Sequence, residues 1–276
     1  MEKVYIFGHR NPDTDSVTAA ITLSYLKNKI GMNTVPAVLS SINLESKFAL
    51  NYFGVEEPIF LNDVNIKIKD LEYTKNYTVK EKDSIYEAYY RMNKAGISKI
   101  PAVDKDKNLL GILSMKDIAK DQFSFNYSYV DATYENICEV IKGKSILKFD
   151  DEITGNLLVA SYKSTTFIEE INLDKDSILI VGDRHSIIEY AVNSGIKLII
   201  ITGNNEIKKE HIDIARKNNV NIIVTPYNTL ETTKIFNLCN NVTTILNTEK
   251  VLCVNENDSI NEFIKLANKT RYSYYP

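Results

Sequence analysis

Two segments of this 276-residue chain repeat each other at a constant spacing of 175 residues. Residues 78–101 read TVKEKDSIYEAYYRMNKAGISKIP and residues 253–276 read CVNENDSINEFIKLANKTRYSYYP, with ten of 24 positions identical. An internal repeat of this length indicates two copies of one supersecondary unit, each too small to bury its apolar face alone. The repeat therefore constrains the fold more than any other feature of the sequence.

The first copy continues past its proline into residues 102–122, AVDKDKNLLGILSMKDIAKDQ. This run predicts a strand, an Asp-rich turn, a second strand and a helix. The second copy stops at Pro276, where the sequence ends. We therefore expect the chain to be a fragment or a truncated product. The alternative is a naturally abbreviated second repeat, which would expose a sheet edge.

The N-terminal segment predicts alternating strands and helices. Strands are expected at residues 3–8, 34–39 and 59–61, and helices at 16–30 and 44–53. A β-α-β-α-β order favours a parallel sheet. Ligands of such sheets bind at the carboxyl ends of the strands.

The segment GHRNPDTDS, residues 8–16, follows the first of these strands. It places His9, Asp13 and Asp15 within seven residues, and imidazole with carboxylate suits Mn, Co, Zn or Mg. The two carboxylates can reach neighbouring ions, and two-ion sites hydrolyse phosphate esters and anhydrides. The alternative is a polar turn in which Asp15 or Ser16 caps the next helix.

The segment between the two copies predicts a second α/β layer structure. Its expected strands are 177–181, 197–201 and 220–224, and its expected helices are 134–141, 185–192, 207–217 and 230–238.

Composition excludes several classes of partner. A net charge of −3 gives no general attraction to nucleic acid or anionic lipid. The longest apolar runs are strand-sized, and we expect neither a membrane helix nor a signal peptide. Cys138, Cys239 and Cys253 form no CxxC pattern, which indicates reduced thiols and a cytoplasmic protein.

These motifs together carry a family resemblance. GHRNPDTDS followed by a helix resembles the first signature of the DHH phosphoesterases, in the form found in family II inorganic pyrophosphatases. The repeat resembles a pair of CBS domains, for which PAVDKDKNLLGILSMKD is typical. The intervening segment resembles a DRTGG domain at Asp183-Arg184 and Thr202-Gly203, with Asn204 in place of the second glycine. This order resembles that of the CBS-domain-containing pyrophosphatases.

The resemblance implies an α/β fold with four parts. Residues 1–65 would be the N-terminal, parallel-sheet part of a DHH catalytic domain, and residues 66–125 the first CBS repeat, β-α-β-β-α. Residues 126–240 would form the DRTGG-like domain, and residues 241–276 an incomplete second CBS repeat.

The activity implied by the resemblance is hydrolysis of pyrophosphate to two phosphates by a metal-bridged hydroxide. Mn²⁺ or Co²⁺ would be bound, with Mg²⁺ at the substrate; His9 and Asp13 would ligate one metal and Asp15 the other. The family's remaining metal ligands, including an Asp-His-His triplet, and its substrate-binding Lys, Arg and His are absent from this sequence. His185 and His211 are expected to be ordinary surface or core histidines. We therefore expect the chain alone to be inactive.

CBS pairs of this family bind adenine nucleotides. By resemblance, a Gly-x-x-Ser-x-x-Asp run, here Gly111, Ser114 and Asp117, contacts the ribose, although Ser114 and Asp117 also fit a capping box. Lys99 would meet a phosphate and Tyr272 would stack on a base. AMP and ADP would inhibit, ATP or diadenosine polyphosphates would activate, and the protein would be a homodimer through its CBS domains.

Two alternatives to a regulated pyrophosphatase stay open. The chain can be an adenine-nucleotide-binding regulatory fragment without catalysis. It can also belong to another DHH phosphoesterase, such as an exopolyphosphatase or oligoribonuclease, although the NPDTDS form and the full insert argue against this.

Overall fold

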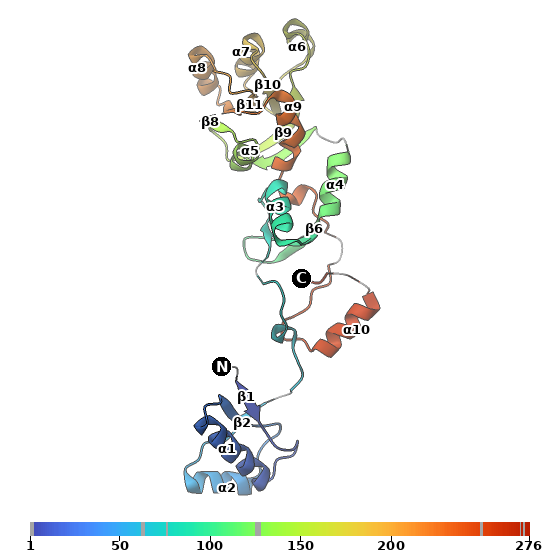
Figure 1. Ribbon diagram of the computed structural model, residues 1–276. Helices are drawn as coiled ribbons and strands as arrows, with labels where there is room; N and C mark the ends of the chain where they lie inside the picture. The colour runs from blue at the N-terminus through green and yellow to red at the C-terminus, as the bar shows by residue number, and fades with distance from the viewer. Residues whose placement is uncertain are drawn as a thin grey trace. The chain divides into compact units, whose positions relative to one another are not determined.

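The protein is described by a computed structural model that covers residues 3–61, 64–75, 77–124, 128–248, 251–270, 272 and 274–276. The chain divides into two compact units, which are shown in Figure 1. Unit 1 consists of Met1–Glu72 and Val254–Arg271, and unit 2 of Tyr73–Cys253 and Tyr272–Pro276.

Unit 1 contains a small parallel sheet. Strands β1 (Val4–Ile6), β2 (Thr34–Val38) and β3 (Ile59–Phe60) pair in that order, and both pairings are parallel. Helices α1 (Thr14–Lys29) and α2 (Leu44–Phe53) connect them. The predicted β-α-β-α-β order is therefore confirmed. The strands run parallel because each helix carries the chain back to the end of the sheet at which the previous strand began.

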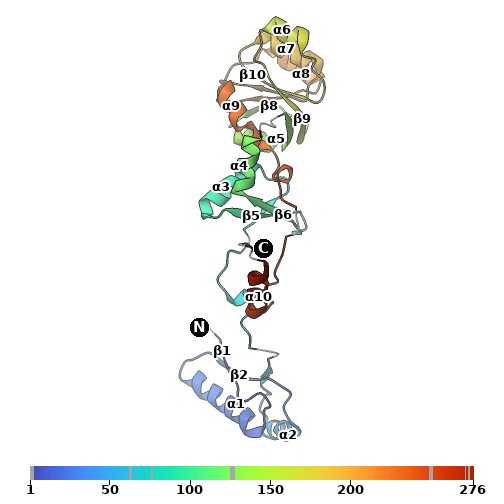
Figure 2. The ribbon, with the colours of Figure 1, turned by 90° about the vertical axis from the view of Figure 1, so that its right-hand side faces the viewer.

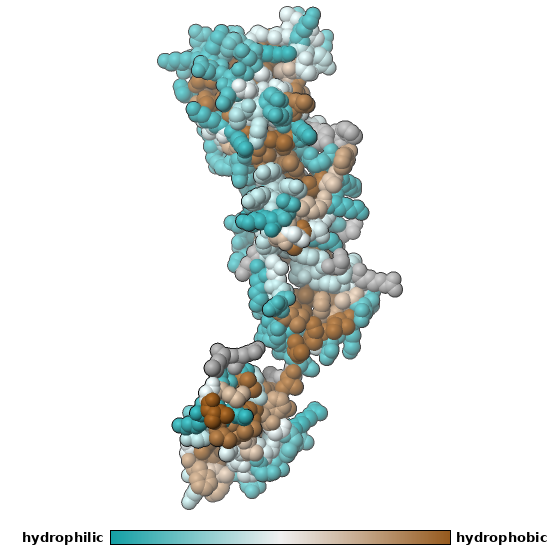
Figure 3. Space-filling view, in the orientation of Figure 1, coloured by the Kyte–Doolittle hydropathy of each residue, from teal (hydrophilic) through white to brown (hydrophobic). Residues whose placement is uncertain are grey.

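The apolar core of this sheet is small. Its buried apolar cluster is Val17, Val38, Ile42 and Leu50. By contrast, α2 exposes Leu44, Phe48, Tyr52 and Phe53, each by more than 70%. Figure 3 shows further apolar surface elsewhere on this unit, over the strands and α1. An exposed apolar area of this kind marks a surface that contacts another protein segment more often than one that faces water.

The internal repeat is visible in the backbone. Helix α3 (Ile85–Ala95) and helix α10 (Ile260–Thr270) begin and end 175 residues apart. In the first copy Ile85 N donates to Asn240 O, and in the second Ile260 N donates to Ile66 O, both at 2.9 Å. The first residue of each helix is thus hydrogen-bonded to the segment that precedes the other copy in the chain.

The first copy forms the predicted strand, turn, strand and helix. Strands β4 (Val79–Lys80), β5 (Lys99–Val103) and β6 (Leu109–Ser114) pair in that order, with β5 and β6 antiparallel, and α4 (Met115–Phe123) follows. Its buried core consists of Val79, Ile85, Ala88, Met92, Ile100, Ala102, Leu113, Ile118 and Val242.

The other part of unit 2 is a six-stranded sheet in the order β7-β9-β10-β11-β12-β8. Strands β9 to β12 are parallel, and β7 and β8 pair antiparallel at the two edges. The strands are β7 (Tyr129–Thr133), β8 (Lys144–Leu147), β9 (Glu152–Val159), β10 (Ser177–Val181), β11 (Leu198–Ile201) and β12 (Asn221–Val224).

Helices cover both faces of this sheet. Figure 2 shows α6, α7 and α8 on one face and α5 and α9 on the other, in agreement with two separate apolar clusters. The helices are α5 (Tyr134–Val140), α6 (Ser164–Glu170), α7 (His185–Ser194), α8 (Lys209–Lys217) and α9 (Thr229–Phe236). The short 3₁₀ segments of the chain are η1 (Ile68–Asp70), η2 (Asn237–Cys239) and η3 (Val242–Thr244). The predicted α/β layer structure is confirmed, with β7, β8, β9 and α6 in addition.

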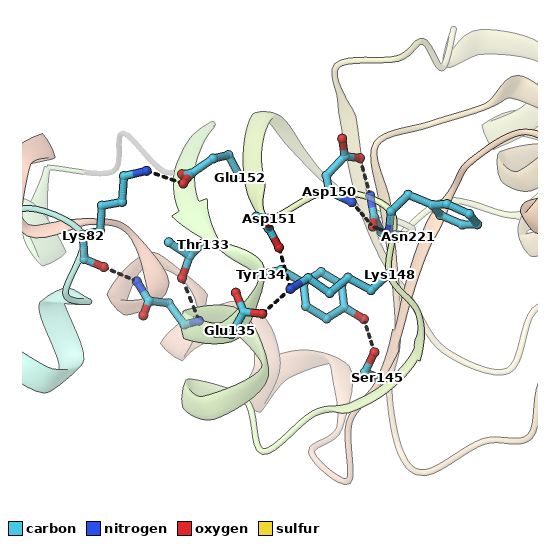
Figure 4. A network of polar contacts seen from close by, with 12 residues as sticks. Lys82, Thr133, Tyr134, Glu135, Ser145, Lys148, Asp150, Asp151, Glu152 and Asn221 are labelled. Carbon is cyan, nitrogen blue, oxygen red and sulfur yellow. Dashed lines mark hydrogen bonds and ion pairs between the residues drawn. The ribbon is translucent and has the colours of Figure 1, made fainter.

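A polar network joins the first repeat to this sheet, as Figure 4 shows. Lys82 Nζ lies 2.5 Å from Glu152 Oε1, and Asn136 Nδ2 donates to Lys82 O at 2.9 Å. Lys148 pairs with both Glu135 and Asp151. These contacts connect the loop before α3 with α5 and β9. The first repeat is therefore held to the six-stranded-sheet part by hydrogen bonds and ion pairs.

Among the described residues, no helix is long and apolar enough to cross a membrane.

Candidate metal and nucleotide sites

The loop after β1 holds the predicted metal ligands. Asp13 is the N-cap of α1, and its Oδ1 accepts a 3.1 Å hydrogen bond from Ser16 N. The cap is therefore Asp13 rather than Asp15 or Ser16. A Cβ added to Gly8 would lie 2.0 Å from Ser16 Oγ, so glycine at this position lets the helix begin directly against the strand end.

His9 and Asp13 face each other in this loop. His9 Nε2 lies 3.3 Å from Asp13 Oδ1, and His9 Nδ1 lies 2.9 Å from the carbonyl oxygen of Asn11. A carbonyl only accepts, so the neutral ring carries its proton on Nδ1 and directs the Nε2 lone pair at the carboxylate. Two electron-rich atoms at this distance repel unless a proton or a cation joins them. This nitrogen and oxygen donor set fits a divalent transition metal.

The pKa of Asp13 is lowered, chiefly because its carboxylate accepts from the backbone N–H of Ser16. Desolvation acts in the opposite direction, while Asp15 and His9 lower the pKa further. Asp15 thus lies near Asp13 in the first turn of α1. Within the described ranges, however, no three His, Cys, Asp or Glu side chains are grouped so that they could hold a metal ion. By itself the loop provides two facing donor groups, the imidazole of His9 and the carboxylate of Asp13.

A cavity of about 360 Å³ lies in unit 2 beside α4. This volume suits a small organic ligand. The lining residues are Asp117, Lys120, Asp121, Ser124, Ile245 and Asn247. The first four occur at helical spacings i, i+3, i+4 and i+7, so they form one face of the helix and its end. That spacing is a signal in the sequence from which Lys120, Asp121 and Ser124 could have been predicted.

Ser114 and Asp117 form the capping box at the start of α4. Asp117 Oδ2 accepts from Ser114 N at 2.9 Å and from Ser114 Oγ at 2.5 Å, and Asp117 N donates to Ser114 Oγ at 3.2 Å. Because Asp117 also lines the cavity, capping and ligand binding are compatible. The box uses Oδ2, and the carboxylate keeps a second oxygen that can accept from a ligand hydroxyl.

The remaining predicted nucleotide residues differ in position. Lys99 pairs with Ser114 across β5 and β6, so it lies at the end of β6 that leads into α4. Tyr272 is half-exposed, its ring lies 6.2 Å from that of Tyr275, and it does not line the cavity. A Cβ on Gly111 would lie 2.4 Å from Asn247 O, so this glycine permits close approach of the cavity wall.

The two other histidines lie in the six-stranded-sheet part of unit 2. His185 begins α7, and its Nε2 lies 3.6 Å from Asp183 Oδ1. His211 is on α8 and is only 5% exposed. His211 therefore differs from His9 and His185, whose side chains are exposed.

Family models match two parts of the chain. Residues 68–123 match the CBS domain and residues 136–239 match the DRTGG domain. The chain therefore contains one domain of each kind in this order. The first coincides with β4 to α4, and the second with most of the six-stranded sheet and its helices.

Curated relatives match nearly the whole chain. A cobalt-dependent inorganic pyrophosphatase of Clostridium perfringens is 30% identical over 99% of this chain and 51% of the relative. A probable manganese-dependent inorganic pyrophosphatase of Thermotoga maritima is 26% identical over 99% of this chain and 51% of the relative. The chain thus spans about half the length of these relatives.

One solved structure shares the fold of most of the chain. It contains the CBS and DRTGG domains of the regulatory region of Clostridium perfringens pyrophosphatase, complexed with the activator diadenosine tetraphosphate. The TM-score is 0.67 at 24% identity, covering 76% of this chain and 94% of that chain. The fold expected from the repeat and the intervening segment is confirmed.

Proposed function

We propose that this chain, whose homologues over 99% of its length are manganese- and cobalt-dependent inorganic pyrophosphatases, supplies one corner of the metal site and the nucleotide-binding region of such an enzyme. The reaction would be hydrolysis of pyrophosphate to two phosphates. The facing pair of His9 Nε2 and Asp13 Oδ1 is the observation that carries the proposal. A capped turn alone does not require the imidazole.

His9 and Asp13 would hold one ion and Asp15 a second. Bound divalent ions supply positive charge that activates water and neutralises phosphoryl oxygens. Within this chain, the Asn11 carbonyl fixes the tautomer of His9, and the Ser16 N–H keeps Asp13 ionised. The relatives are about twice as long, so further protein would complete the site and cover the exposed apolar side chains of α2.

The cavity beside α4 would bind an adenine nucleotide: AMP, ADP, ATP or a diadenosine polyphosphate. The similar regulatory region of Clostridium perfringens pyrophosphatase binds diadenosine tetraphosphate as its activator. Asp117 would accept from a ribose hydroxyl, and Lys120 would attract a phosphate. Asp121 also lines the cavity, and because its negative charge opposes that of the phosphate, we expect AMP to bind weakly.

The domain assignment follows the same proposal. Residues 1–65 would belong to the catalytic domain, 66–125 to the first CBS repeat, 126–240 to the DRTGG domain and 241–276 to a second CBS repeat. The protein would be cytoplasmic and would form a homodimer through its CBS domains.

The metal assignment is tested by titrating the chain with Mn²⁺ and measuring the free ion by electron paramagnetic resonance. Asp13→Asn keeps an oxygen that can accept from Ser16 N but removes the charge, and we expect at least about tenfold weaker binding. Asp106→Asn, which changes an exposed carboxylate in another turn, is the matched control. Equal affinity in the wild type and Asp13→Asn would remove Asp13 from the site.

The nucleotide assignment is tested by calorimetry with AMP. Asp117→Asn retains an acceptor for Ser114 and preserves α4, whereas the negative charge at the cavity is lost. We expect AMP binding to weaken in this variant and to be unchanged in Asp106→Asn. The same affinity in all three proteins would contradict a ribose contact by Asp117.

A regulatory module without catalysis is the second candidate. It is favoured because no three His, Cys, Asp or Glu side chains among the described residues lie together so that they could hold a metal ion. Phosphate release from pyrophosphate with Mn²⁺ present separates the two functions for this polypeptide. We expect negligible release from the chain alone. Release that disappears in Asp13→Asn would instead assign catalysis to these residues.

A further inference from the structure

The cavity beside α4 has two unlike sides. Asp117 and Asp121 are half-buried and lie one helical turn apart, whereas Lys120 and Ser124 are exposed. Successive residues of a helix are rotated by about 100° around its axis, so Lys120 and Asp121 diverge to opposite sides of Asp117. A ligand that contacts Asp117 at its centre therefore meets an ammonium group on one side and a carboxylate on the other.

The carboxylate of Asp121 is held in place from outside α4. Its Oδ2 accepts a 3.0 Å hydrogen bond from Asn237 Nδ2 of the DRTGG domain. An ionised carboxylate has two oxygens with about four acceptor positions and no proton to donate. Asp121 can therefore accept a further hydrogen bond from a ligand, and it pairs favourably only with a ligand group that donates.

The second wall of the cavity carries an apolar side chain. Ile245 lines the cavity and packs against the buried core of the first repeat. Close by in the chain, Asn247 N and O pair with Ile112 O and N of β6 at 3.3 and 3.2 Å, which holds this wall beside the sheet. A flat apolar ring gains free energy by packing on such a side chain and leaving water.

These features orient a nucleotide whose ribose contacts Asp117. A phosphate turned toward Asp121 would meet a like charge, whereas one turned toward Lys120 meets an opposite charge. The base then lies on the half-buried side, between Asp121 and Ile245. Adenine presents one donor group on its major-groove edge, the 6-amino group, and its ring nitrogens only accept. The 6-amino group is thus the part of the base that suits Asp121.

We propose that Asp121 selects the base of the bound nucleotide by accepting a hydrogen bond from the 6-amino group of adenine, with Asn237 as the residue that positions the carboxylate. The proposal rests on the proposed nucleotide-binding function and adds the residue that reads the base. A purine without the amino group leaves the half-buried carboxylate without this donor, which lowers the affinity.

The test compares AMP with purine riboside 5′-monophosphate, which differs from AMP only in lacking the 6-amino group. Isothermal titration calorimetry of the full chain at pH 7.5 gives both affinities. Because a charge-assisted hydrogen bond is lost, we expect the wild type to bind AMP at least about tenfold more tightly. Similar affinities would overturn the role of Asp121 and leave the nucleotide site standing. Binding of neither ligand would contradict the nucleotide-binding function, and this proposal with it.

Asp121→Asn links the preference to this side chain. The amide oxygen can still accept from Asn237 Nδ2, so the contact with the DRTGG domain is preserved. A neutral acceptor forms a hydrogen bond about half as strong, and the ratio of the two affinities should fall at least about threefold. Asp106→Asn changes an exposed residue that does not line the cavity and should keep the wild-type ratio. An unchanged ratio in Asp121→Asn would overturn the proposal, because a purely structural role affects both ligands alike.

Discussion

Asn237 Nδ2 donates a 3.0 Å hydrogen bond to Asp121 Oδ2. Asn237 lies in η2, at the end of the DRTGG domain, and Asp121 lies on the face of α4 that lines the cavity. Burial raises the pKa of Asp121, and hydrogen bonds from Gln122 and Asn237 partly offset this effect. The neighbouring DRTGG domain therefore holds one side chain of the cavity wall. A ligand bound in the cavity would contact a residue that is hydrogen-bonded to that domain.

Asn237→Ala should destabilise unit 2. The substitution leaves a partly buried carboxylate without one of its donors, which costs about 1–3 kcal/mol. Urea denaturation followed by circular dichroism measures the loss. Asn193→Ala removes a hydrogen bond to Glu189 O within an exposed helix turn and should change the free energy of unfolding by less than about 0.5 kcal/mol. Equal effects of the two variants would contradict a structural role for the Asn237–Asp121 bond.

Gly111→Ala should disrupt the cavity wall. The new Cβ would lie 2.4 Å from Asn247 O and 2.8 Å from Leu246 Cγ, so residues 246–247 must move away from β6. Overpacking of this kind costs about 1–3 kcal/mol. We expect a lower melting temperature and weaker AMP binding.

Gly182→Ala is the control for this substitution, because its Cβ would meet Thr202 Oγ1 and Thr229 Oγ1 at 3.7 Å, an ordinary contact distance. Its melting temperature and AMP affinity should stay near those of the wild type. If Gly111→Ala also retained both properties, the close approach of residues 246–247 to β6 would not matter for the cavity.

The elements that could be predicted from sequence are those with strong local patterns. ILIV and LIII are continuous apolar runs, and they lie in β10 and β11 at the centre of the sheet. The strands β7 and β8, in contrast, carry polar residues and lie at its edges. Their pairing is decided by contacts with β9 and β12, so the local sequence indicates them only weakly.

The same distinction applies to the sites. Residue types and spacing were enough to single out His9 and Asp13, which face each other in the structure. The tautomer of His9 depends on a backbone carbonyl, which no residue type specifies. Asn247 reaches the cavity through pairing with β6, a contact between distant parts of the chain. The burial of His211 likewise depends on how α7 and α8 pack.

The three cysteines should differ in reactivity. Cys253 is exposed, whereas burial raises the pKa of Cys239 well above its usual value. Burial, together with Glu135, raises the pKa of Cys138 to about 11. Because the thiolate is the nucleophile, we expect one fast equivalent with a disulfide reagent at pH 8 and two more only in urea. Cys253→Ser should remove the fast phase; its persistence would contradict these assignments.

The free energy of unfolding should depend on His211 below neutral pH. Burial lowers the pKa of its ring in the folded state below the usual 6.5, with further lowering from His185 and Lys208 against the effects of Glu189 and Glu210. Below pH 6.5 the unfolded chain therefore binds a proton that the folded chain excludes, and stability falls as the pH decreases. Urea denaturation in phosphate-free buffer at pH 7.5 and 5.5 should give a smaller difference for His211→Gln than for the wild type. His9→Gln should keep the wild-type difference, and an unchanged difference in His211→Gln would contradict the prediction.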